Sequence, residues 1–449
     1  MSNSINARRV AWDVINAVHA KDAYSNLILP RAISDAGLDS RDAGLATELT
    51  YGTLRRQGSL DTVIAACAAR DDIDPGVLDV LRIGAYQMLF MRVPSHAAVD
   101  ESVTLAKTVA SHGAAKFVNA VLRRVSERDW DEWLTLLSEP MSAVDKLAFE
   151  YSYPVWVIRA LADAYSLDAQ SIVPVLAAGN EPALISVVAR PGQSTIDDVM
   201  SISGVTPGRW SPLAGTLERS TRPGDIEAIR LGHIGVQDEG SQLVALAVAQ
   251  VPVAGSQSHW LDMCAGPGGK AAILAGFADV AGVRFTALEP IQTRAELVAN
   301  SLRDAPGQHE VLTMDARTYS TSDLCDRILI DAPCTGLGAL RRRPEARWRR
   351  TPSDIPVLTA LQKELLEHAS SLVRIGGIIG YATCSPHLAE TDAIVSGFLR
   401  NHSEFSEVEL STVLPQLELP EGSTRLRLRP DVHGTDGMFL AILRRNDEG

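Results

Sequence analysis

A chain of 449 residues is too long for one ordinary domain, so we expect two or three domains. Hydrophobic residues make up 46% of it and charged residues 22%, a composition typical of a soluble globular protein. Apolar runs fall short of the roughly 18 residues that a membrane span needs. The segment 1–9 has no apolar stretch of the kind that secretory signals carry. The five cysteines lack metal-ligand spacing. We therefore expect a reduced, cytoplasmic location and no metal site.

The net charge of −13 taken alone argues against a nucleic-acid-binding protein. The charge is unevenly distributed, however, because arginines crowd into two segments. These are Arg341, Arg342, Arg343, Arg347, Arg349 and Arg350 in one segment, and Arg425, Arg427 and Arg429 in the other. Each cluster is either a local phosphate-binding surface or an ordinary solvated face.

Residues from about 6 to 138 are predicted to be helical, because apolar residues recur there with helical spacing. Three such stripes are Val10, Val14, Ala17 and Val18; Leu78, Leu81, Ala85 and Met88; and Val118, Val121, Leu122 and Val125. Asp74 followed by Pro75 predicts an N-cap and a first helical turn. We expect an all-α domain over residues 1–138 whose stripes form its core.

Residues 139–255 have a mixed pattern. A helix is predicted to open around Tyr153 and to run to Tyr165, and residues 182–190 are rich in β-forming residues. Residues 204–224 are rich in Gly, Pro, Ser and Thr, which predicts loops and short strands. We interpret this range as a small α/β connector, to which the pattern assigns no function.

Strand and helix patterns alternate over residues 256–449. The predicted strands are His259–Cys264, Val283–Glu289, Glu310–Thr313, Arg327–Asp331, Gly377–Thr383 and Phe439–Leu443. Such alternation predicts a Rossmann-like parallel sheet with helices on both faces. Ligands bind such sheets at the carboxyl ends of the strands, so polar residues at those ends are the candidates for a site.

The turn at 264–270, Cys-Ala-Gly-Pro-Gly-Gly-Lys, lies between a predicted strand and a predicted helix. Glycine lets the backbone approach a ligand, and a helix N-terminus offers free N–H groups to it. Glu289 ends the next strand, roughly 20 residues further on, where an acid accepts hydrogen bonds from ribose hydroxyls. The turn lacks the patterns of a dinucleotide site and of a P-loop, which disfavours an NAD enzyme or an NTPase. A glycine-rich turn of this kind can also be only a turn.

Two cysteines follow predicted strand ends, Cys334 in Asp-Ala-Pro-Cys-Thr-Gly and Cys384 in Tyr-Ala-Thr-Cys-Ser-Pro. One such cysteine would be most simply explained as a small buried hydrophobe. Two of them, beside a cofactor turn and with Asp331 three residues before Cys334, indicate a reactive site.

These motifs resemble the Sun (Fmu) family of RNA cytosine-C5 methyltransferases, in particular its members that act on bacterial small-subunit ribosomal RNA. The resemblance covers nearly the whole chain. It includes the segments 264–270, 331–336, 341–348, 381–385 and 434–439, and the stretches 81–89, 94–101 and 117–124 resemble a NusB-like domain. It implies a NusB-like helical RNA-binding domain over 1–138, the α/β connector over 139–255, and a Rossmann-like methyltransferase domain over 256–449.

The resemblance also implies roles for individual residues. S-adenosylmethionine would contact Cys264, Ala265, Gly266, Pro267, Gly268, Gly269 and Lys270, with Glu289 on the ribose, Asp315 beside the adenine and Asp331 also near the cofactor. Cys384 would be the nucleophile that adds to C6 of cytosine, and Cys334 would assist release. Asp331 would bind the pyrimidine edge near N3, with Lys270 positioning it. Arg341, Arg342, Arg343, Arg347 and Arg349 would hold phosphates of the RNA, most simply 16S ribosomal RNA bound by a monomer.

Three departures from the family pattern stand out. Gly266 replaces a common alanine, Glu289 replaces a common aspartate, and residues 386–392 replace part of an acidic-asparagine run. The first two changes are expected to matter little, and the third leaves the helix start after Ser385 open.

Two alternatives remain open. One is the same chemistry on transfer RNA or on another ribosomal site, and the other is an RNA-binding assembly factor with a decayed catalytic domain. Intact Cys334, Cys384 and Asp331 argue against decay. DNA methylation is disfavoured, because DNA cytosine-C5 enzymes use the Pro-Cys cysteine as nucleophile and lack such a helical domain.

Overall fold

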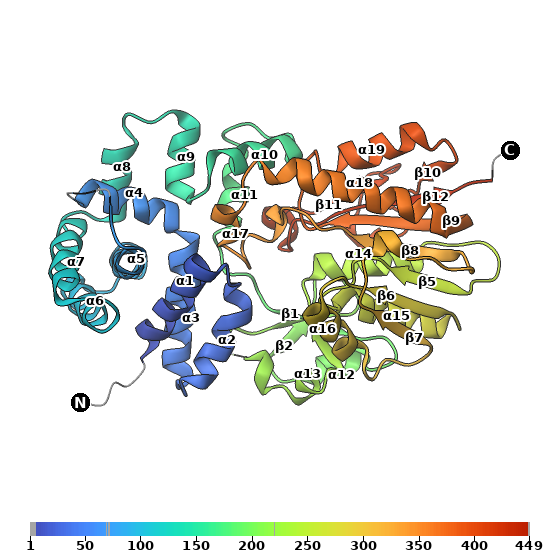
Figure 1. Cartoon of the computed structure of the whole chain (residues 1–449), viewed down its shortest axis with the longest axis horizontal. Coiled ribbons are helices and arrows are strands. Elements are labelled where there is room, and N and C mark those ends of the chain that lie inside the picture. The colour runs from blue at the N-terminus through green and yellow to red at the C-terminus, as the bar shows by residue number, and fades with distance from the viewer. Residues whose placement is uncertain (1–5, 69, 71, 220, 448–449) are drawn as a thin grey trace. The chain divides into compact units, whose positions relative to one another are not determined.

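The computed structural model describes residues 6–68, 70, 72–219 and 221–447. The chain divides into two compact units (Figure 1). Unit 1 comprises Met1–Ala162, Ser166–Glu181 and Leu340–Arg350, and unit 2 comprises Asp163–Tyr165, Pro182–Ala339 and Thr351–Gly449. The range 139–255, predicted as a separate connector, is thus shared between the two units. Within the described part of the chain, no helix is both long and apolar enough to cross a bilayer.

Unit 1 is helical. Its helices are α1 (Ala7–Lys21), α2 (Ser25–Asp35), α3 (Ser40–Arg55), α4 (Gln57–Cys67), α5 (Pro75–Leu89), α6 (Ser95–Val109), α7 (His112–Val125), α8 (Trp130–Ser138), α9 (Ala143–Tyr151), most of α10 (Val155–Tyr165), α11 (Val173–Ala178) and α17 (Ala346–Arg349). The predicted cap is confirmed, because the Asp74 side chain accepts a hydrogen bond from the backbone N–H of Val77 and α5 begins at Pro75. The predicted stripes lie in the core, where Val14, Leu81 and Leu122 are almost fully buried.

Unit 2 contains two sheets. The smaller sheet is antiparallel in the order β2-β3-β1-β4, and it accounts for the β-rich and loop-rich part of the predicted connector. Its strands are β1 (Ser186–Ala189), β2 (Val205–Pro207), β3 (Ala214–Leu217) and β4 (Ile234–Val236), accompanied by α12 (Ile196–Met200), η1 (Pro223–Asp225) and α13 (Glu227–Arg230).

The larger sheet has the order β10-β12-β9-β8-β5-β6-β7, with β11 also paired to β12. Its strands are β5 (His259–Asp262), β6 (Arg284–Leu288), β7 (His309–Leu312), β8 (Cys325–Asp331), β9 (Val373–Thr383), β10 (Phe405–Glu407), β11 (Arg425–Arg427) and β12 (Phe439–Arg445). Strands β5 to β9 are parallel, as predicted. The sheet as a whole is mixed, because β12 runs antiparallel to β9, and β10 and β11 run antiparallel to β12.

Helices cover both faces of this sheet, and the strands alternate their side chains between the two cores (Figure 1). Helices α14 (Glu239–Gln250), α15 (Gly269–Val280) and α16 (Gln292–Leu302) cover one face, and α18 (Asp354–Leu372) and α19 (Asp392–Asn401) cover the other. In β8, for example, Leu329 belongs to the first core, while Ile328 and Ile330 belong to the second. The short segments η2 (Ala316–Thr318), η3 (Leu337–Ala339), η4 (Pro415–Leu417) and α20 (Pro430–His433) complete unit 2.

Helix α15 packs closely against the loop after β1, and one glycine makes that contact possible. A Cβ at Gly276 would lie 2.1 Å from the carbonyl oxygen of Pro191, a backbone atom that cannot rotate away. Gly397 in α19 is a matched position with open space, since its Cβ would meet only Arg400 at 3.7 Å.

We therefore expect opposite effects from the same substitution. Gly276→Ala should lower the free energy of unfolding by about 1–3 kcal/mol through overpacking. Gly397→Ala should raise it by about 0.5–1 kcal/mol, because alanine loses less backbone entropy in a helix. Urea unfolding of both variants measures this, and stabilisation by Gly276→Ala would contradict the close packing of α15.

Candidate active site

The turn at 264–270 joins the end of β5 to the start of α15, as predicted. Gly268 has φ of 111°, and a Cβ there would lie 3.1 Å from the backbone of Val298. Both the backbone conformation and the contact therefore require glycine. The N–H of Gly268 donates to the carbonyl of Ala265 at 2.7 Å, and α15 begins at Gly269 with no side-chain cap. The first N–H groups of α15 and its positive dipole end suit an anionic or nucleotide-like ligand.

Glu289 follows β6 and lies against this turn, where only 1% of the residue is exposed. One carboxylate oxygen accepts from the N–H of Ile291 at 3.1 Å, and the other lies 3.3 Å from the guanidinium of Arg294. Arg294 also donates to the carbonyl of Gly266 at 2.8 Å. The predicted acceptor for ribose is thus held by an ion pair at the predicted turn.

The departures from the family pattern at Gly266 and Glu289 depend on each other, because both concern the same space in the structure. A Cβ at Gly266 would lie 2.1 Å from the Oε2 atom of Glu289. The longer glutamate therefore occupies the space that an alanine methyl would take, contrary to the expectation that these changes matter little.

Asp262, the last residue of β5, is fully buried beneath the turn. One of its oxygens accepts from the N–H of Cys264, and the other has no hydrogen-bond partner among the described residues. Burial, followed by repulsion from Asp331, raises the pKa of Asp262 to about 7. Asp262 was not among the predicted site residues, because the predicted strand ran on to Cys264, whereas β5 ends at Asp262.

Lys270 and Asp331 connect the cofactor turn to β8. The Nζ atom of Lys270 donates to Oδ2 of Asp331 at 2.9 Å, and both side chains are largely buried. Burial lowers the pKa of Lys270, but attraction to Asp331, with smaller contributions from Cys384 and Asp262, outweighs burial and raises it. Lys270 is therefore a cation at neutral pH, close enough to Cys384 to stabilise a negative sulfur.

The two predicted cysteines meet. The Sγ atoms of Cys334, after β8, and Cys384, after β9, are 3.4 Å apart, and both residues are half-buried. The hydrogen bond with Cys384, together with burial, raises the pKa of the Cys334 thiol well above its usual value. The N–H of Gly338 donates to the carbonyl of Cys384, and the N–H of Gly437 donates to the carbonyl of Gly338. The segments 381–385 and 434–439 are thus both hydrogen-bonded to Gly338, in the loop after β8.

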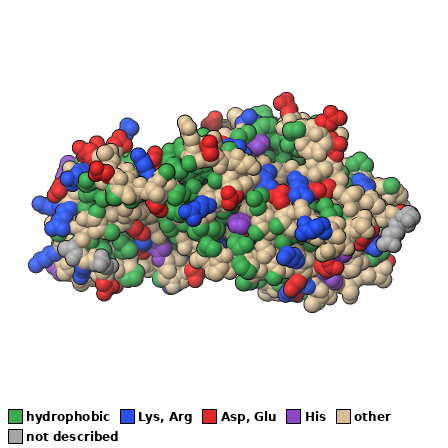
Figure 2. Space-filling view, turned by 90° about the horizontal axis from the view of Figure 1, so that it is seen from above, with side chains coloured by type: hydrophobic (Ala, Val, Ile, Leu, Met, Phe, Trp, Pro, Cys, Tyr) green, Lys and Arg blue, Asp and Glu red, His purple; other side chains and the backbone are tan. Residues whose placement is uncertain are grey.

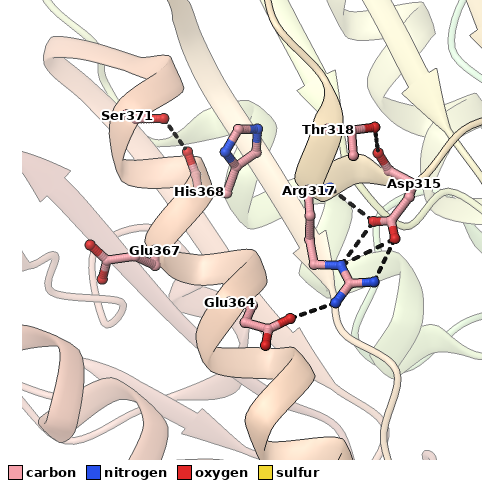
Figure 3. A pocket seen from close by; sticks show the side chains of 7 residues that line it. All are labelled: Asp315, Arg317, Thr318, Glu364, Glu367, His368 and Ser371. Atoms are coloured by element: carbon pink, nitrogen blue, oxygen red, sulfur yellow. Dashed lines mark hydrogen bonds and ion pairs between the residues drawn. The ribbon is translucent and has the colours of Figure 1, made fainter.

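Asp315, predicted to lie beside the adenine, follows β7 and lines a pocket of about 650 Å³ with residues of α18 (Figure 3). Its carboxylate forms an ion pair with Arg317 at 2.6 Å and accepts from the backbone N–H of Arg317. These hydrogen bonds lower the pKa of Asp315. Arg317 also contacts Glu364 at 2.5 Å. The predicted cofactor residue therefore already has a charged partner.

The basic segment 341–350 belongs to unit 1. Arg347 is fully buried there, and burial lowers its pKa to about 10. Its guanidinium lies 3.8 Å from the ring centre of Tyr153. It donates to the carbonyls of Arg55, Ser152 and Gly179, to Oδ1 of Asn180 and to the hydroxyl of Tyr153. Arg347 therefore does not belong to an exposed phosphate-binding surface, contrary to the sequence-based expectation, because its donors are used inside the helical unit.

The other arginines of this segment differ from one another. Arg349 donates to the carbonyls of Val18 and Ala23, which ties α17 to the α1–α2 connection. Arg343 is exposed. Lys and Arg side chains are interspersed with Asp and Glu side chains on the face drawn in Figure 2. Arg341 is buried too, at 8% exposure, contrary to the expectation of a phosphate contact there. Phosphate contact remains a proposal for Arg342 and Arg343.

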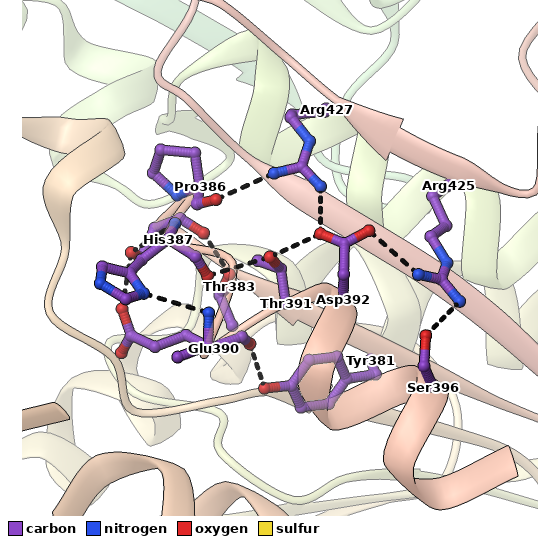
Figure 4. Close-up of polar contacts among 12 residues, drawn as sticks. Tyr381, Thr383, Pro386, His387, Glu390, Thr391, Asp392, Ser396, Arg425 and Arg427 are labelled. Atoms are coloured by element: carbon purple, nitrogen blue, oxygen red, sulfur yellow. Dashed lines mark hydrogen bonds and ion pairs between the residues drawn. The ribbon is translucent and has the colours of Figure 1, made fainter. Parts of the chain in front are cut away.

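The second basic cluster is paired with acids in unit 2. Asp392, the first residue of α19, contacts both Arg425 and Arg427 (Figure 4). Arg425 also pairs with Glu407 at 2.7 Å, and Arg429 pairs with Asp431 at 2.6 Å. Arg425 and Arg427 hold β11 and α19 together, and that helix starts at Asp392, which answers the question left open by the sequence.

A mixed sheet with helices on both faces, a glycine turn before α15 and a buried acid after β6 together define a Rossmann-like methyltransferase. The turn and Glu289 suit S-adenosylmethionine, which carries an amino acid, a ribose and an adenine.

Comparisons with known proteins also identify methyltransferases as relatives of this chain. Residues 251–444 match a family model described as 16S rRNA methyltransferase RsmB/F, and residues 5–127 match a NusB family model. A putative methyltransferase of Mycobacterium tuberculosis is 46% identical over 98% of this chain and 96% of its own. The probable ribosomal RNA small subunit methyltransferase B of Bacillus subtilis is 32% identical over 98% of each chain. The solved structure of PH0851 shares the fold, with a TM-score of 0.81 at 21% identity over 98% of this chain and 99% of its own.

This chain belongs to the RsmB/F family of RNA methyltransferases, which use S-adenosylmethionine, and it carries the NusB domain at its N-terminus.

The contact between Gly266 and Glu289 predicts a compensating pair of substitutions. Gly266→Ala should weaken S-adenosylmethionine binding by about tenfold, because the displaced Glu289 loses one charge-assisted hydrogen bond. Adding Glu289→Asp shortens the acid by one methylene and should recover most of the affinity. Calorimetric titration of the wild type, both single variants and the double variant measures the coupling. Additive losses would contradict it.

Asp262 predicts a pH dependence of stability. Its pKa is about 7 in the folded chain and about 3.9 in the unfolded chain, so the folded chain keeps a proton that the unfolded chain releases. The free energy of unfolding should therefore fall as the pH rises from about 4 to 7, by at most about 1.4 kcal/mol per pH unit.

Asp262→Asn removes this titration. Urea unfolding at pH 5, 6 and 7, without cofactor, should show the wild type losing stability relative to the variant as the pH rises. Parallel stability curves would mean that the carboxyl group is already ionised at pH 5.

Proposed function

We propose that this enzyme methylates C5 of a cytosine in small-subunit (16S) ribosomal RNA through a covalent bond between Cys384 and C6 of the base. One observation carries the proposal. Two thiols lie 3.4 Å apart at the carboxyl ends of adjacent strands, beside the ion pair of Lys270 and Asp331. Carbon C5 of cytosine is a poor nucleophile, and addition of a thiolate at C6 moves electron density onto it.

The position of Lys270 supports the assignment of the two sulfurs. The pKa of Lys270 responds to Cys384, so this cation would stabilise negative charge on the Cys384 sulfur, which lies 3.4 Å from the Cys334 sulfur. Cys264, the third cysteine nearby, has its pKa raised by burial and is a poor nucleophile.

The thiolate Sγ atom of Cys384 bonds to C6, and the electron pair of the C5–C6 double bond attacks the methyl group from C5. Bound S-adenosylmethionine would supply that group as an electrophile, and its sulfur would keep the electron pair of the broken S–CH3 bond. The C5 proton then passes to solvent water, the electron pair of the C5–H bond re-forms the C5–C6 double bond, and the S–C6 bond breaks to return the thiolate. We assign assistance in this release to Cys334 and binding of the pyrimidine edge to Asp331.

We also propose which residues bind the parts of S-adenosylmethionine. The backbone of 264–270 would bind the amino-acid part, Glu289 the ribose and Asp315 the adenine side. The side chain of Arg294 is 47% exposed, so it can move aside when a ribose reaches Glu289. The target cytosine must leave its stack to reach the sulfurs, so single-stranded or flipped RNA is the expected substrate.

Covalent trapping tests the roles of the two sulfurs. Wild type, Cys334→Ala and Cys384→Ala are incubated with unmethylated small-subunit RNA and S-adenosylmethionine, and protein–RNA adducts are read on denaturing gels. Cys334→Ala should accumulate the adduct, because release is impaired, and Cys384→Ala should form none. Cys325→Ala, which removes a buried thiol at the opposite end of β8, should behave like the wild type.

The reversed pattern would make Cys334 the nucleophile. If none of the proteins forms an adduct or transfers a methyl group, the experiment is repeated with transfer RNA in place of ribosomal RNA. Activity on transfer RNA alone would contradict the proposal that the substrate is ribosomal RNA. Inactivity on both RNAs would favour the alternative of an RNA-binding assembly factor.

A further inference from the structure

A fully buried glutamate lies between β9 and α19 and is not used by the chemistry described so far. Glu390 is 0% exposed, and both of its carboxylate oxygens accept hydrogen bonds. The Oε1 atom accepts from the N–H of Thr335 at 2.8 Å and from Nε2 of Gln362 at 3.2 Å. The Oε2 atom accepts from the hydroxyls of Thr335 at 2.5 Å and Ser385 at 2.7 Å. All four donors are uncharged.

Two of the residues that donate to Glu390 are the direct neighbours of the two cysteines. Thr335 directly follows Cys334, and Ser385 directly follows Cys384. The two hydroxyls are also 2.9 Å from each other. A single carboxylate therefore joins the two loops that carry the thiols, at one residue's distance from each sulfur-bearing residue.

Further contacts fix the carboxylate and the loops. Gln362 of α18 donates to Glu390 and also to the carbonyl of Pro333 at 2.8 Å, on the other side of Cys334. The hydroxyl of Tyr381 donates to the backbone carbonyl of Glu390 at 2.7 Å (Figure 4). Glu390 is thus held from the strand, from α18 and from both loops.

We propose that Glu390 is a positioning residue that sets the spacing of the Cys334 and Cys384 thiols; the catalytic consequence of this role rests on the proposed function above. Glu390 touches neither sulfur, and its effect passes through Thr335 and Ser385. Fixed spacing matters because one sulfur must reach C6 while the other acts on the same base, and small displacements in such sites slow reactions strongly.

An amide replaces this carboxylate only with weaker hydrogen bonds. Each oxygen accepts from two donors, so a glutamine would turn its NH₂ group toward two of them, and the hydroxyls of Thr335 and Ser385 would have to rotate and accept instead. Both hydroxyls then lose a charge-assisted hydrogen bond, which weakens the connection between the two loops. Glu390→Gln therefore loosens the spacing of the thiols without changing the volume of the side chain.

Asp326 offers a matched control. It is a carboxylate at the amino end of β8, 1% exposed, that accepts from the N–H groups of Ser258 and His259 and pairs with Arg374 at 2.6 Å. Asp326→Asn makes the same carboxylate-to-amide change in the same sheet, at the end of β8 away from the cysteines.

The first measurement needs no RNA. Phenylarsine oxide binds two thiols only when they lie close together, and its affinity for the full-length protein is measured for wild type, Glu390→Gln and Asp326→Asn. Glu390→Gln should bind about tenfold more weakly, the equivalent of roughly one lost charge-assisted hydrogen bond. Asp326→Asn should bind like the wild type, and Cys334→Ala defines the background. Wild-type affinity in Glu390→Gln would overturn the proposal.

The second measurement is methyl transfer. Glu390→Gln should lower kcat by about tenfold or more while the Kd for S-adenosylmethionine stays within about twofold, because the cofactor turn is untouched. A purely structural role would lower the urea midpoint and leave kcat of the folded fraction unchanged. An unchanged kcat, or an equal loss in Asp326→Asn, would overturn the catalytic part.

Ser385→Ala removes a single donor to Glu390. It is the variant to test if Glu390→Gln does not fold. It should weaken phenylarsine oxide binding in the same direction, and wild-type affinity would overturn the proposal. If phenylarsine oxide binding changes as expected but even the wild type transfers no methyl group to any RNA, the proposed function fails while the spacing role stands.

Discussion

The parallel pairing of β8 with β9 is the constraint on which the site depends. Ile330 lies opposite Tyr381, and Asp331 lies opposite Ala382. Because parallel strands end at the same edge of a sheet, the loops after these two strands must emerge together. That register brings together two thiols that are far apart in the sequence. A slip of one residue would turn the strand side chains to the opposite core and separate the loops.

Electrostatics then distinguishes groups that are chemically similar. Lys270 forms an ion pair with Asp331, and its pKa also responds to Cys384 and Asp262. Asp262 is buried and holds a proton up to about pH 7, whereas Asp331 has an ammonium partner. The hydrogen bond with Cys384 and burial raise the pKa of the Cys334 thiol, and the pKa of Lys270 responds to Cys384. The same low-polarity surroundings thus affect the two carboxyl groups differently, because only Asp331 has a cationic partner.

Local patterns in the sequence predicted the structural features that depend on interactions between neighbouring residues. The cap at Asp74, the parallel strands β5 to β9 and the glycine turn followed from spacing and residue type. Arg347 was misjudged, because a charged run has the same spacing whether it faces solvent or fills a polar interior. The fit of Gly266 to Glu289 and the contacts of Glu390 with both cysteine loops could not be predicted, since both depend on contacts across the fold that spacing cannot show.

The central claim, reaction at C5 of cytosine, has a direct test. Small-subunit RNA carrying tritium at C5 of its cytosines is incubated with the enzyme and S-adenosylmethionine, and tritium in water is counted against methyl groups in RNA. The mechanism predicts one tritium released for each methyl group transferred, because the C5 hydrogen must leave when the S–C6 bond breaks. Methyl transfer without release of tritium would contradict the account, since it would place the new methyl group elsewhere on the RNA.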